Sequence, residues 1–116
     1  MVIIDSTKFG SVTINGRTYC EEDNYIVFWD GEITGLHSAQ RYLFGKLELM
    51  RILKNPEIII VGTGDSGLLR VSEEVRRLCL EKKIELIEMV SKQAIEKFNE
   101  TFNQGGKVVA FIHLTC

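Results

Sequence analysis

The stretch EIIIVGTGDSG, residues 57–67, decides how the rest of the chain is arranged. Its four consecutive Ile and Val residues, 58–61, offer apolar side chains to both faces of a strand, as the middle of a covered sheet requires. Three glycines follow within six positions, and glycine permits backbone angles and close approaches that other residues do not. We therefore expect a central strand that ends in a tight loop from Gly62 to Gly67, here called the glycine loop.

Upstream of this strand, Asn15-Gly16 is the clearest turn signal in the chain. The pair favours a two-residue turn with positive φ angles, which suits a β-hairpin. This turn sets Val12 opposite Tyr19 and Ile14 opposite Arg17 on one face. The hairpin is therefore expected to cover a core with that side.

The segment between the hairpin and the central strand is expected to contain one strand, one connection and one helix. Residues 25–29, YIVFW, are bulky and apolar on both faces and predict an inner strand. Residues 33–44 have no clean period and predict a long surface connection. From Gly45 the apolar residues recur at helical spacing, which predicts a helix that ends at Asn55-Pro56. The apolar stripe of this helix is expected to be Leu47, Met50 and Leu53.

After the glycine loop, helices alternate with strands. Ser72 is the expected N-cap of one helix and Ser91 of a second. Residues 84–90 and 108–112 predict strands, and the last of these is apolar on both faces and hence central. The alternation predicts an α/β fold with an extra β layer from the N-terminal hairpin. The expected helix stripes are Val75, Leu78 and Cys79, then Ala94, Ile95, Phe98 and Phe102.

Composition indicates one domain, residues 1–116, and excludes several classes of protein. A net charge of −2 with no basic stripe argues against nucleic-acid binding. No apolar run approaches the roughly 20 residues that span a bilayer, and the start of the chain lacks the basic flank of a signal peptide. The three widely spaced cysteines favour reduced thiols and a cytoplasmic location.

The glycine loop satisfies the dinucleotide-binding pattern G-x-G-x-x-G, but its spacing argues against a nucleotide. In that motif the helix begins within the glycines, so that its N–H groups point at the pyrophosphate. Here the expected N-cap, Ser72, lies five residues beyond Gly67, and Asp65 would place a negative charge beside the phosphates. We expect a tight structural bend and no cofactor.

Catalytic and metal sites are not expected either. His113 and Cys116 are three residues apart on a predicted strand, so they point to opposite faces and cannot share a metal without a bend. Cys116 also carries the terminal carboxylate, which opposes formation of a reactive thiolate. His37 and His113 could pair across space, although a lone strand histidine is more often hydrogen-bonded packing. No residue is assigned a catalytic role, and the chain is more in keeping with a protein that is not an enzyme.

Several segments together resemble a known family. They are IIVGTGDSG at residues 59–67, Leu69, Val71, Glu74-Val75 and the closing HLTC at residues 113–116. They are similar to a small domain of unknown function found in archaea, bacteria and eukaryotes. Relatives include an adipogenesis-associated protein and a mitochondrial complex I assembly factor.

The resemblance implies a three-layer fold, in which a central mixed sheet with one antiparallel strand is flanked by helices and a β layer. It implies no established reaction or cofactor. His37 falls where many members carry a histidine. Ser72 stands where many have proline, and serine and proline both suit a helix start. The mitochondrial role is not expected to transfer, because no transit peptide opens the sequence.

Two functions from different classes remain. The first is a non-enzymatic protein-interaction or assembly module with an unknown protein partner, acting as a monomer or weak homodimer without nucleic acid or membrane. The second is a small-molecule or anion site, with or without enzymatic activity, at the glycine loop. One concave pocket around His37, Thr63, Asp65 and His113 would favour the second, and dispersed side chains with an apolar surface patch the first. The candidate binding residues are His37, Thr63, Gly64, Asp65, Ser66 and His113.

Overall fold

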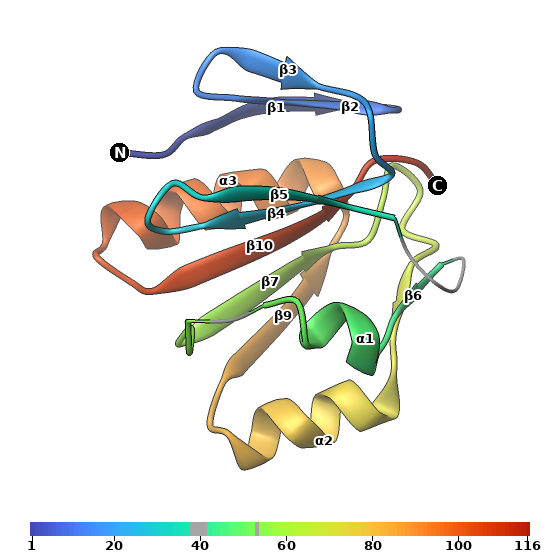
Figure 1. Cartoon of the computed structure of the whole chain (residues 1–116), viewed down its shortest axis with the longest axis vertical. Coiled ribbons are helices and arrows are strands. Elements are labelled where there is room, and N and C mark those ends of the chain that lie inside the picture. The colour runs from blue at the N-terminus through green and yellow to red at the C-terminus, as the bar shows by residue number, and fades with distance from the viewer. Residues whose placement is uncertain (38–41, 53) are drawn as a thin grey trace.

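A mixed β-sheet forms the middle layer of the molecule (Figure 1). The computed structural model describes residues 1–37, 42–52 and 54–116. Among them, five strands form this sheet in the order β5-β4-β10-β7-β9. Only β4 runs against the others, since β10 pairs antiparallel with β4 and β4 with β5, whereas β10, β7 and β9 are parallel. The expected mixed sheet with one antiparallel strand is confirmed. The bounds are β4 Asn24–Phe28, β5 Ile33–Leu36, β7 Ile58–Gly62, β9 Glu85–Met89 and β10 Val108–His113.

Strand β7 is central, as its sequence predicts. It lies between β10 and β9, and its apolar side chains enter the cores on both faces of the sheet. Ile60 packs into one core, whereas Ile59 and Val61 pack into the other. Two-sided burial is the reason why these positions are continuously β-branched and do not alternate with polar residues.

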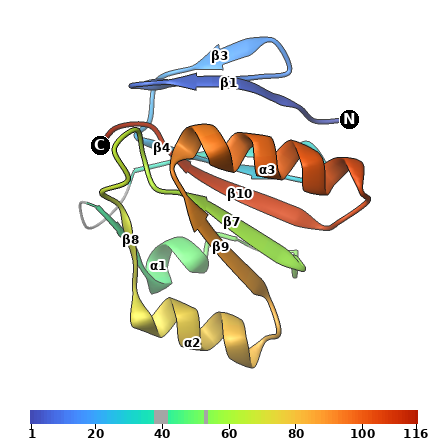
Figure 2. The same cartoon turned by 180° about the vertical axis from the view of Figure 1, so that it is seen from behind.

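Helices cover both faces of the sheet. Helix α3 (Ser91–Asn103) packs on β10 and β7 through Ala94, Ile95 and Phe98, and Figure 2 shows it in front of these strands. Helix α2 (Glu73–Glu81) buries Val75 and Cys79 in the core of the opposite face, where the short α1 (Lys46–Leu49) also lies. No helix in the described residues is long and apolar enough to cross a membrane.

The N-terminal β layer lies beside α3 on the same face of the central sheet. It comprises β1 (Ile4–Lys8), β2 (Ser11–Ile14) and β3 (Arg17–Tyr19), in that order. The turn between β2 and β3 has φ angles of 50° at Asn15 and 82° at Gly16, and it pairs Val12 with Tyr19. The expected hairpin and its register are confirmed. Strand β1 was not anticipated, since only Ile4 in it is buried and its other residues are polar.

The prediction of a long connection at residues 33–44 is wrong where the structure describes it. Residues Ile33–Leu36 form β5 at the edge of the sheet, and Leu43–Phe44 form β6, which pairs in parallel with β8 (Arg70–Val71). Residues 38–41 lie outside the described part of the chain. An edge strand has one neighbour and can include a residue such as Gly35, so its pattern is weaker than that of a central strand.

The helix after Gly45 ends at Leu49 and not at Asn55-Pro56, and its predicted stripe is also wrong. Leu47 and Met50 are 63% and 60% exposed, whereas Glu48 is buried, and Leu53 lies outside the described residues. The Gly45 N–H donates to the Glu48 carboxylate at 2.7 Å. This contact fixes the start of α1 with its one acidic residue inward, so the apolar side chains on either side of Glu48 are turned outward.

Candidate functional site

The glycine loop lies at the carboxyl end of β7, against the C-terminal segment (residues 113–116). Gly64 and Gly67 have φ angles of 103° and 75°, which glycine adopts without strain. A Cβ atom at Gly64 would lie 2.5 Å from the carbonyl carbon of Cys116. The expected tight bend with closely packed backbones is therefore present.

The backbone donors of the glycine loop are largely used inside the protein. The Gly64 N–H donates to the Ser91 hydroxyl at 3.0 Å, and the Asp65 N–H donates to the Thr115 carbonyl at 2.8 Å. Just beyond the loop, the Leu68 N–H donates to the Cys116 carbonyl at 2.9 Å. A phosphate cradle needs such N–H groups to be free for its ligand. Here the Asp65 and Leu68 donors hold the C-terminal segment, and the Gly64 donor is taken by Ser91.

Ser91 joins three elements, and its predicted role as an N-cap is wrong. The N-cap of α3 is Val90, and Ser91 is the first residue of the helix. The buried Ser91 hydroxyl accepts the Gly64 N–H and donates to the His113 carbonyl at 2.7 Å. Glycine loop, α3 and β10 are thereby fixed relative to one another.

His113 is buried in a hydrogen-bonded chain of side chains. Asn24 donates its amide NH₂ to the Leu36 carbonyl at 3.0 Å, which leaves the amide oxygen facing His113 Nδ1 at 2.7 Å. Nδ1 must then carry the proton, so Nε2 accepts from the Thr115 hydroxyl at 3.1 Å. Burial lowers the pKa of His113 below its ordinary value, although the negative charge of Asp23 opposes this. The imidazole is therefore held neutral near pH 7.

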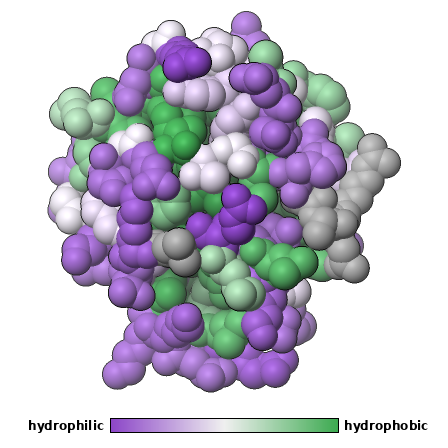
Figure 3. Space-filling view, in the orientation of Figure 1, coloured by the Kyte–Doolittle hydropathy of each residue, from purple (hydrophilic) through white to green (hydrophobic). Residues whose placement is uncertain are grey.

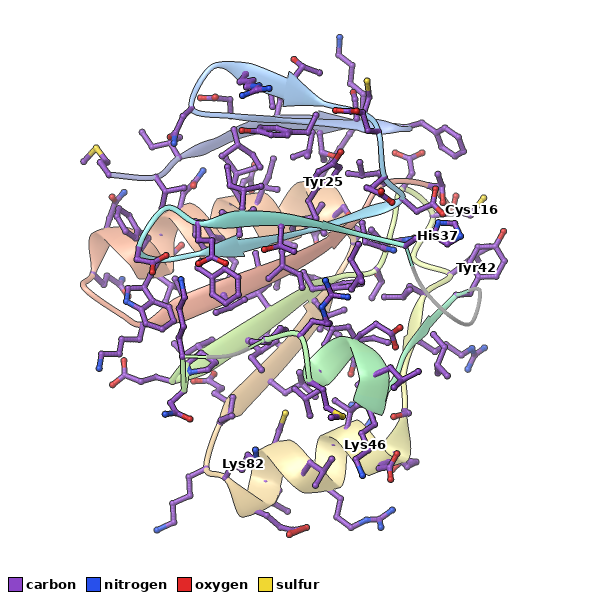
Figure 4. The ribbon with its side chains drawn as sticks, viewed as in Figure 1. Tyr25, His37, Tyr42, Lys46, Lys82 and Cys116 are labelled. Atoms are coloured by element: carbon purple, nitrogen blue, oxygen red, sulfur yellow. The ribbon has the colours of Figure 1, made fainter. Side chains whose placement is uncertain are left out.

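His37 lies at the same end of the molecule but is exposed. Its Nδ1 is 3.2 Å from the Asp23 carboxylate, and the Asp23 main-chain carbonyl accepts the N–H of Leu114. Figure 4 shows His37, Tyr42 and Cys116 on this side in one view. The Tyr42 ring packs edge-on to His113 at 6.2 Å between centroids. The negative charge of Asp23 thus acts on both histidines, and no hydrogen bond joins His37 to His113.

The remaining candidates divide between two places. The Thr63 hydroxyl is buried and donates to the Met89 carbonyl at 3.2 Å, and Thr63 and Ser66 line an open hollow of about 660 Å³. Asp65 is exposed and borders, with His113, a crevice of only about 10 Å³. Thr63 and Asp65 thus border different hollows, and His37 lines neither of these two.

The hollow beside the glycine loop lies where β7 and β9 end and α2 begins. Across it, Arg76 Nη1 lies 2.5 Å from Glu88 and Nε lies 3.5 Å from Glu73, and Arg70 also borders it. The hydrogen bond with Glu88 raises the pKa of Arg76. Sequence reasoning missed this contact between α2 and β9, because it assigned Arg76 to the solvated face of its helix.

Two further residues around His113 were also missed. Asn24 is the first residue of β4 and ends a polar break in the sequence, and Tyr42 lies within the unpatterned segment 33–44, so no spacing marked either. Within the described residues, no three His, Cys, Asp or Glu side chains converge as metal ligands.

Solved structures with this fold come from several organisms. A conserved hypothetical protein of Pyrococcus horikoshii OT3 is 24% identical, with a TM-score of 0.85 over 97% of this chain and 98% of that chain. A protein called MT938 is 27% identical, with a TM-score of 0.81 and full coverage of both chains, 100% each. A Bordetella pertussis protein described as an Mth938-like domain is 18% identical, with a TM-score of 0.75 over 97% and 85% of the two chains.

The match to a protein family extends over almost the whole chain. Residues 4–113 match the family described as protein of unknown function DUF498/DUF598. This span includes all five strands of the central sheet, the glycine loop and His113 among the described residues. The chain belongs to the DUF498/DUF598 family of proteins of unknown function.

Proposed function

We propose that this domain is a non-enzymatic protein-interaction or assembly module that binds its partner through α1. The observation that carries the proposal is the exposure of Leu47 and Met50, two large apolar side chains on one turn. Together with the half-buried Leu43 they form the α1 surface. Figure 3 shows apolar residues gathered in this region with hydrophilic residues around them.

The α1 surface has the form of a small docking site. A hollow of about 360 Å³ lies beside it, with Leu43 and Leu47 as apolar lining and Lys46 and Glu74 as charged lining. An apolar centre with a polar rim is the usual anatomy of a protein interface. Burying each exposed large side chain would contribute about 1.5–3 kcal/mol, which is the scale of an anchoring residue. The assembly-factor relative implied by the sequence resemblance would suit such a surface.

The test compares two variants with the natural chain. Leu47→Asp combined with Met50→Asp places charge on the α1 surface, and both positions are exposed enough to tolerate it. Phe9→Asp is the matched control, because Phe9 is 64% exposed but lies in the turn between β1 and β2. Cross-linked complexes are captured from the native cell extract and quantified by mass spectrometry. A partner retained by the natural chain and Phe9→Asp, but lost with the double variant, supports the module; equal recovery with all three contradicts it.

The hollow beside the glycine loop supports a second function, binding of a small molecule or anion. Its position at the carboxyl ends of parallel strands is where α/β proteins usually bind ligands. Since the loop's N–H groups hold the C-terminal segment, side chains such as Ser66, Arg70 and Arg76 would make the contacts. Thr63 would act through its bond to Met89, and Gly64 and Asp65 through the loop conformation. His37 and His113 would lie outside this hollow.

A thermal-shift screen of metabolites tests this second function. A ligand of the hollow should raise the melting temperature of the natural chain, and Arg70→Ala should reduce that shift because it removes an exposed cation from the lining. Lys46→Ala, which removes a cation from the α1 surface, is the control and should leave the shift unchanged. The site is contradicted if no metabolite shifts the melting temperature, or if Arg70→Ala and Lys46→Ala reduce the shift equally.

A further inference from the structure

Strand β9 leaves one side of its backbone without a partner. It is the last strand of the central sheet, and no described residue pairs with its outer edge (Figure 1). The Glu85 N–H donates to Glu57 at 3.0 Å, and the Met89 carbonyl accepts from Thr63 at 2.9 Å, so both residues face β7. Successive residues of a strand turn their backbone groups to opposite sides. Leu86 and Glu88 therefore direct their N–H and C=O groups outward.

The outer edge of β9 lacks the usual protection against strand pairing. Natural edge strands carry proline, lysine or bulges that prevent a second strand from adding. β9 reads ELIEM, with no proline or lysine, and its register with β7 continues over all five residues without a bulge. The Glu88 side chain is also neutralised by Arg76 at 2.5 Å. Glu85 is left as the exposed acid of the strand.

We propose that β9 pairs antiparallel with β9 of a second copy of this chain, about a two-fold axis through Ile87. In this register Leu86 lies opposite the partner's Glu88, and Glu85 lies opposite the partner's Met89. Each acidic residue then meets an apolar one and no like charges are directly opposed, so the strand is complementary to itself. The outward groups of Leu86 and Glu88 exchange hydrogen bonds with the same groups of the partner. Two-fold pairing uses the outer β9 edge of each copy and closes the assembly at a dimer.

Half-buried apolar side chains lie on both faces of the proposed junction. Leu86 packs at the margin of the core under α2, and Ile87 and Met89 lie at the margin of the core under α3. Pairing would cover their remaining exposed surface. Because two five-residue strands make a small contact, the interface belongs to the weak class below about 1,200 Å². The dimer is therefore expected to depend on concentration. It does not use the α1 surface and goes beyond the module proposed above.

A pair of substitutions at Glu88 separates strand pairing from other causes of association. Glu88→Pro removes an outward N–H that the fold does not use and blocks an added strand. Glu88→Thr removes the same charge and the same contact with Arg76, but it keeps the N–H and suits a strand. Analytical ultracentrifugation from about 10 μM to about 1 mM should show the natural chain and Glu88→Thr approaching twice 13.2 kDa. Glu88→Pro should remain at 13.2 kDa, with circular dichroism showing that it is folded.

Hydrogen exchange of the natural chain gives a readout that does not depend on any variant. The Leu86 and Glu88 amides should become more protected as concentration rises, whereas the Ile87 amide, which faces β7, should not change. A chain that stays monomeric at about 1 mM overturns the proposal. So does a dimer that leaves these two amides unprotected or forms equally well with Glu88→Pro. The Leu47→Asp and Met50→Asp double variant should still dimerise, so failure of one proposal is distinguishable from failure of the other.

Discussion

Gly64 shows how a single residue position controls the glycine loop. Its φ is 103°, and a Cβ atom added there would lie 2.5 Å from the Cys116 carbonyl carbon, so no side chain fits without movement. We expect Gly64→Ala to lower the free energy of unfolding by more than about 1 kcal/mol. Asp65→Ala is the control, since that side chain is exposed, and should change stability little. Urea denaturation of both variants measures the difference. A Gly64→Ala protein as stable as the natural chain would show that the C-terminal segment is not tightly held.

His113 makes stability depend on pH. Burial lowers its pKa in the folded state, so between that value and the ordinary pKa of about 6.5 the unfolded chain binds more protons. Its contribution is therefore fully present above about pH 6.5 and is lost as the pH falls through the folded-state pKa. Urea unfolding at pH 7.5 and 5.5 should show a decrease for the natural chain. The decrease should be smaller for His113→Gln, and an identical pH dependence would contradict the assignment.

The surroundings of individual residues were only partly predictable from the sequence. The glycine run predicted unusual backbone angles, and two of its three glycines, Gly64 and Gly67, have the positive φ that few other residues adopt. The pairing of His113 with Asn24 had no such signal, since Asn24 lies near the other end of the chain, whereas Thr115 is only two residues away. A hydrogen bond between residues 89 positions apart depends on the sheet order, which no local pattern contains.

At the scale of elements, the β2–β3 hairpin depends on Gly16. With φ at 82°, a β-branched residue is strained, and we expect Gly16→Val to lower the free energy of unfolding by about 1 kcal/mol or more. Gly16→Asn is the control, because asparagine tolerates this region and a Cβ here would meet no atom within 4 Å. Thermal unfolding of both variants tests the effect. Equal melting temperatures would mean that the turn does not require its positive φ.

Elements whose residue pattern has one dominant physical cause were predictable from the sequence, and elements in which two causes compete were not. The strands β7 and β10 are apolar over residues 58–61 and 108–112 because both faces are covered. Ser72 caps α2 by accepting the Val75 N–H at 3.2 Å. In α1 the period of leucine and methionine competes with a capping contact from Glu48 to Gly45. The cap prevails because α1 has only four residues, which is too short for an apolar stripe to determine its orientation.

At the scale of the whole molecule, the layers were predictable but their connections were not. Helices alternating with strands that are apolar on both faces predicted an α/β sheet covered on both sides. The order of its strands, and the addition of β1 to the hairpin, depend on contacts between distant segments. The same contacts bring the C-terminal segment to the N-terminal layer, where the Gly10 N–H donates to the Leu114 carbonyl at 2.7 Å.

Asn99 joins the N-terminal β layer to the rest of the molecule. Its amide oxygen accepts the Ile4 N–H at 3.0 Å, and its amide NH₂ donates to the Ile4 carbonyl at 2.9 Å. Asn99→Ala leaves both partly buried backbone groups unpaired. We therefore expect a loss of about 1–3 kcal/mol in the free energy of unfolding and faster hydrogen exchange in β1. Asn103→Ala is the matched control, because Asn103 lies one turn further along α3 and is exposed.

The pattern of exchange in Asn99→Ala distinguishes two ways in which the layers can be coupled. If Asn99 couples the layers, β1 and β2 should exchange faster while β7 and β10 keep their protection, because the central sheet retains its own core on the opposite face. Uniformly faster exchange would instead show that both sheets unfold as one unit. Exchange in β1 as slow as in Asn103→Ala would show that the shared apolar core, with Ile4, Val12 and Phe98, holds the layer without the Asn99 hydrogen bonds.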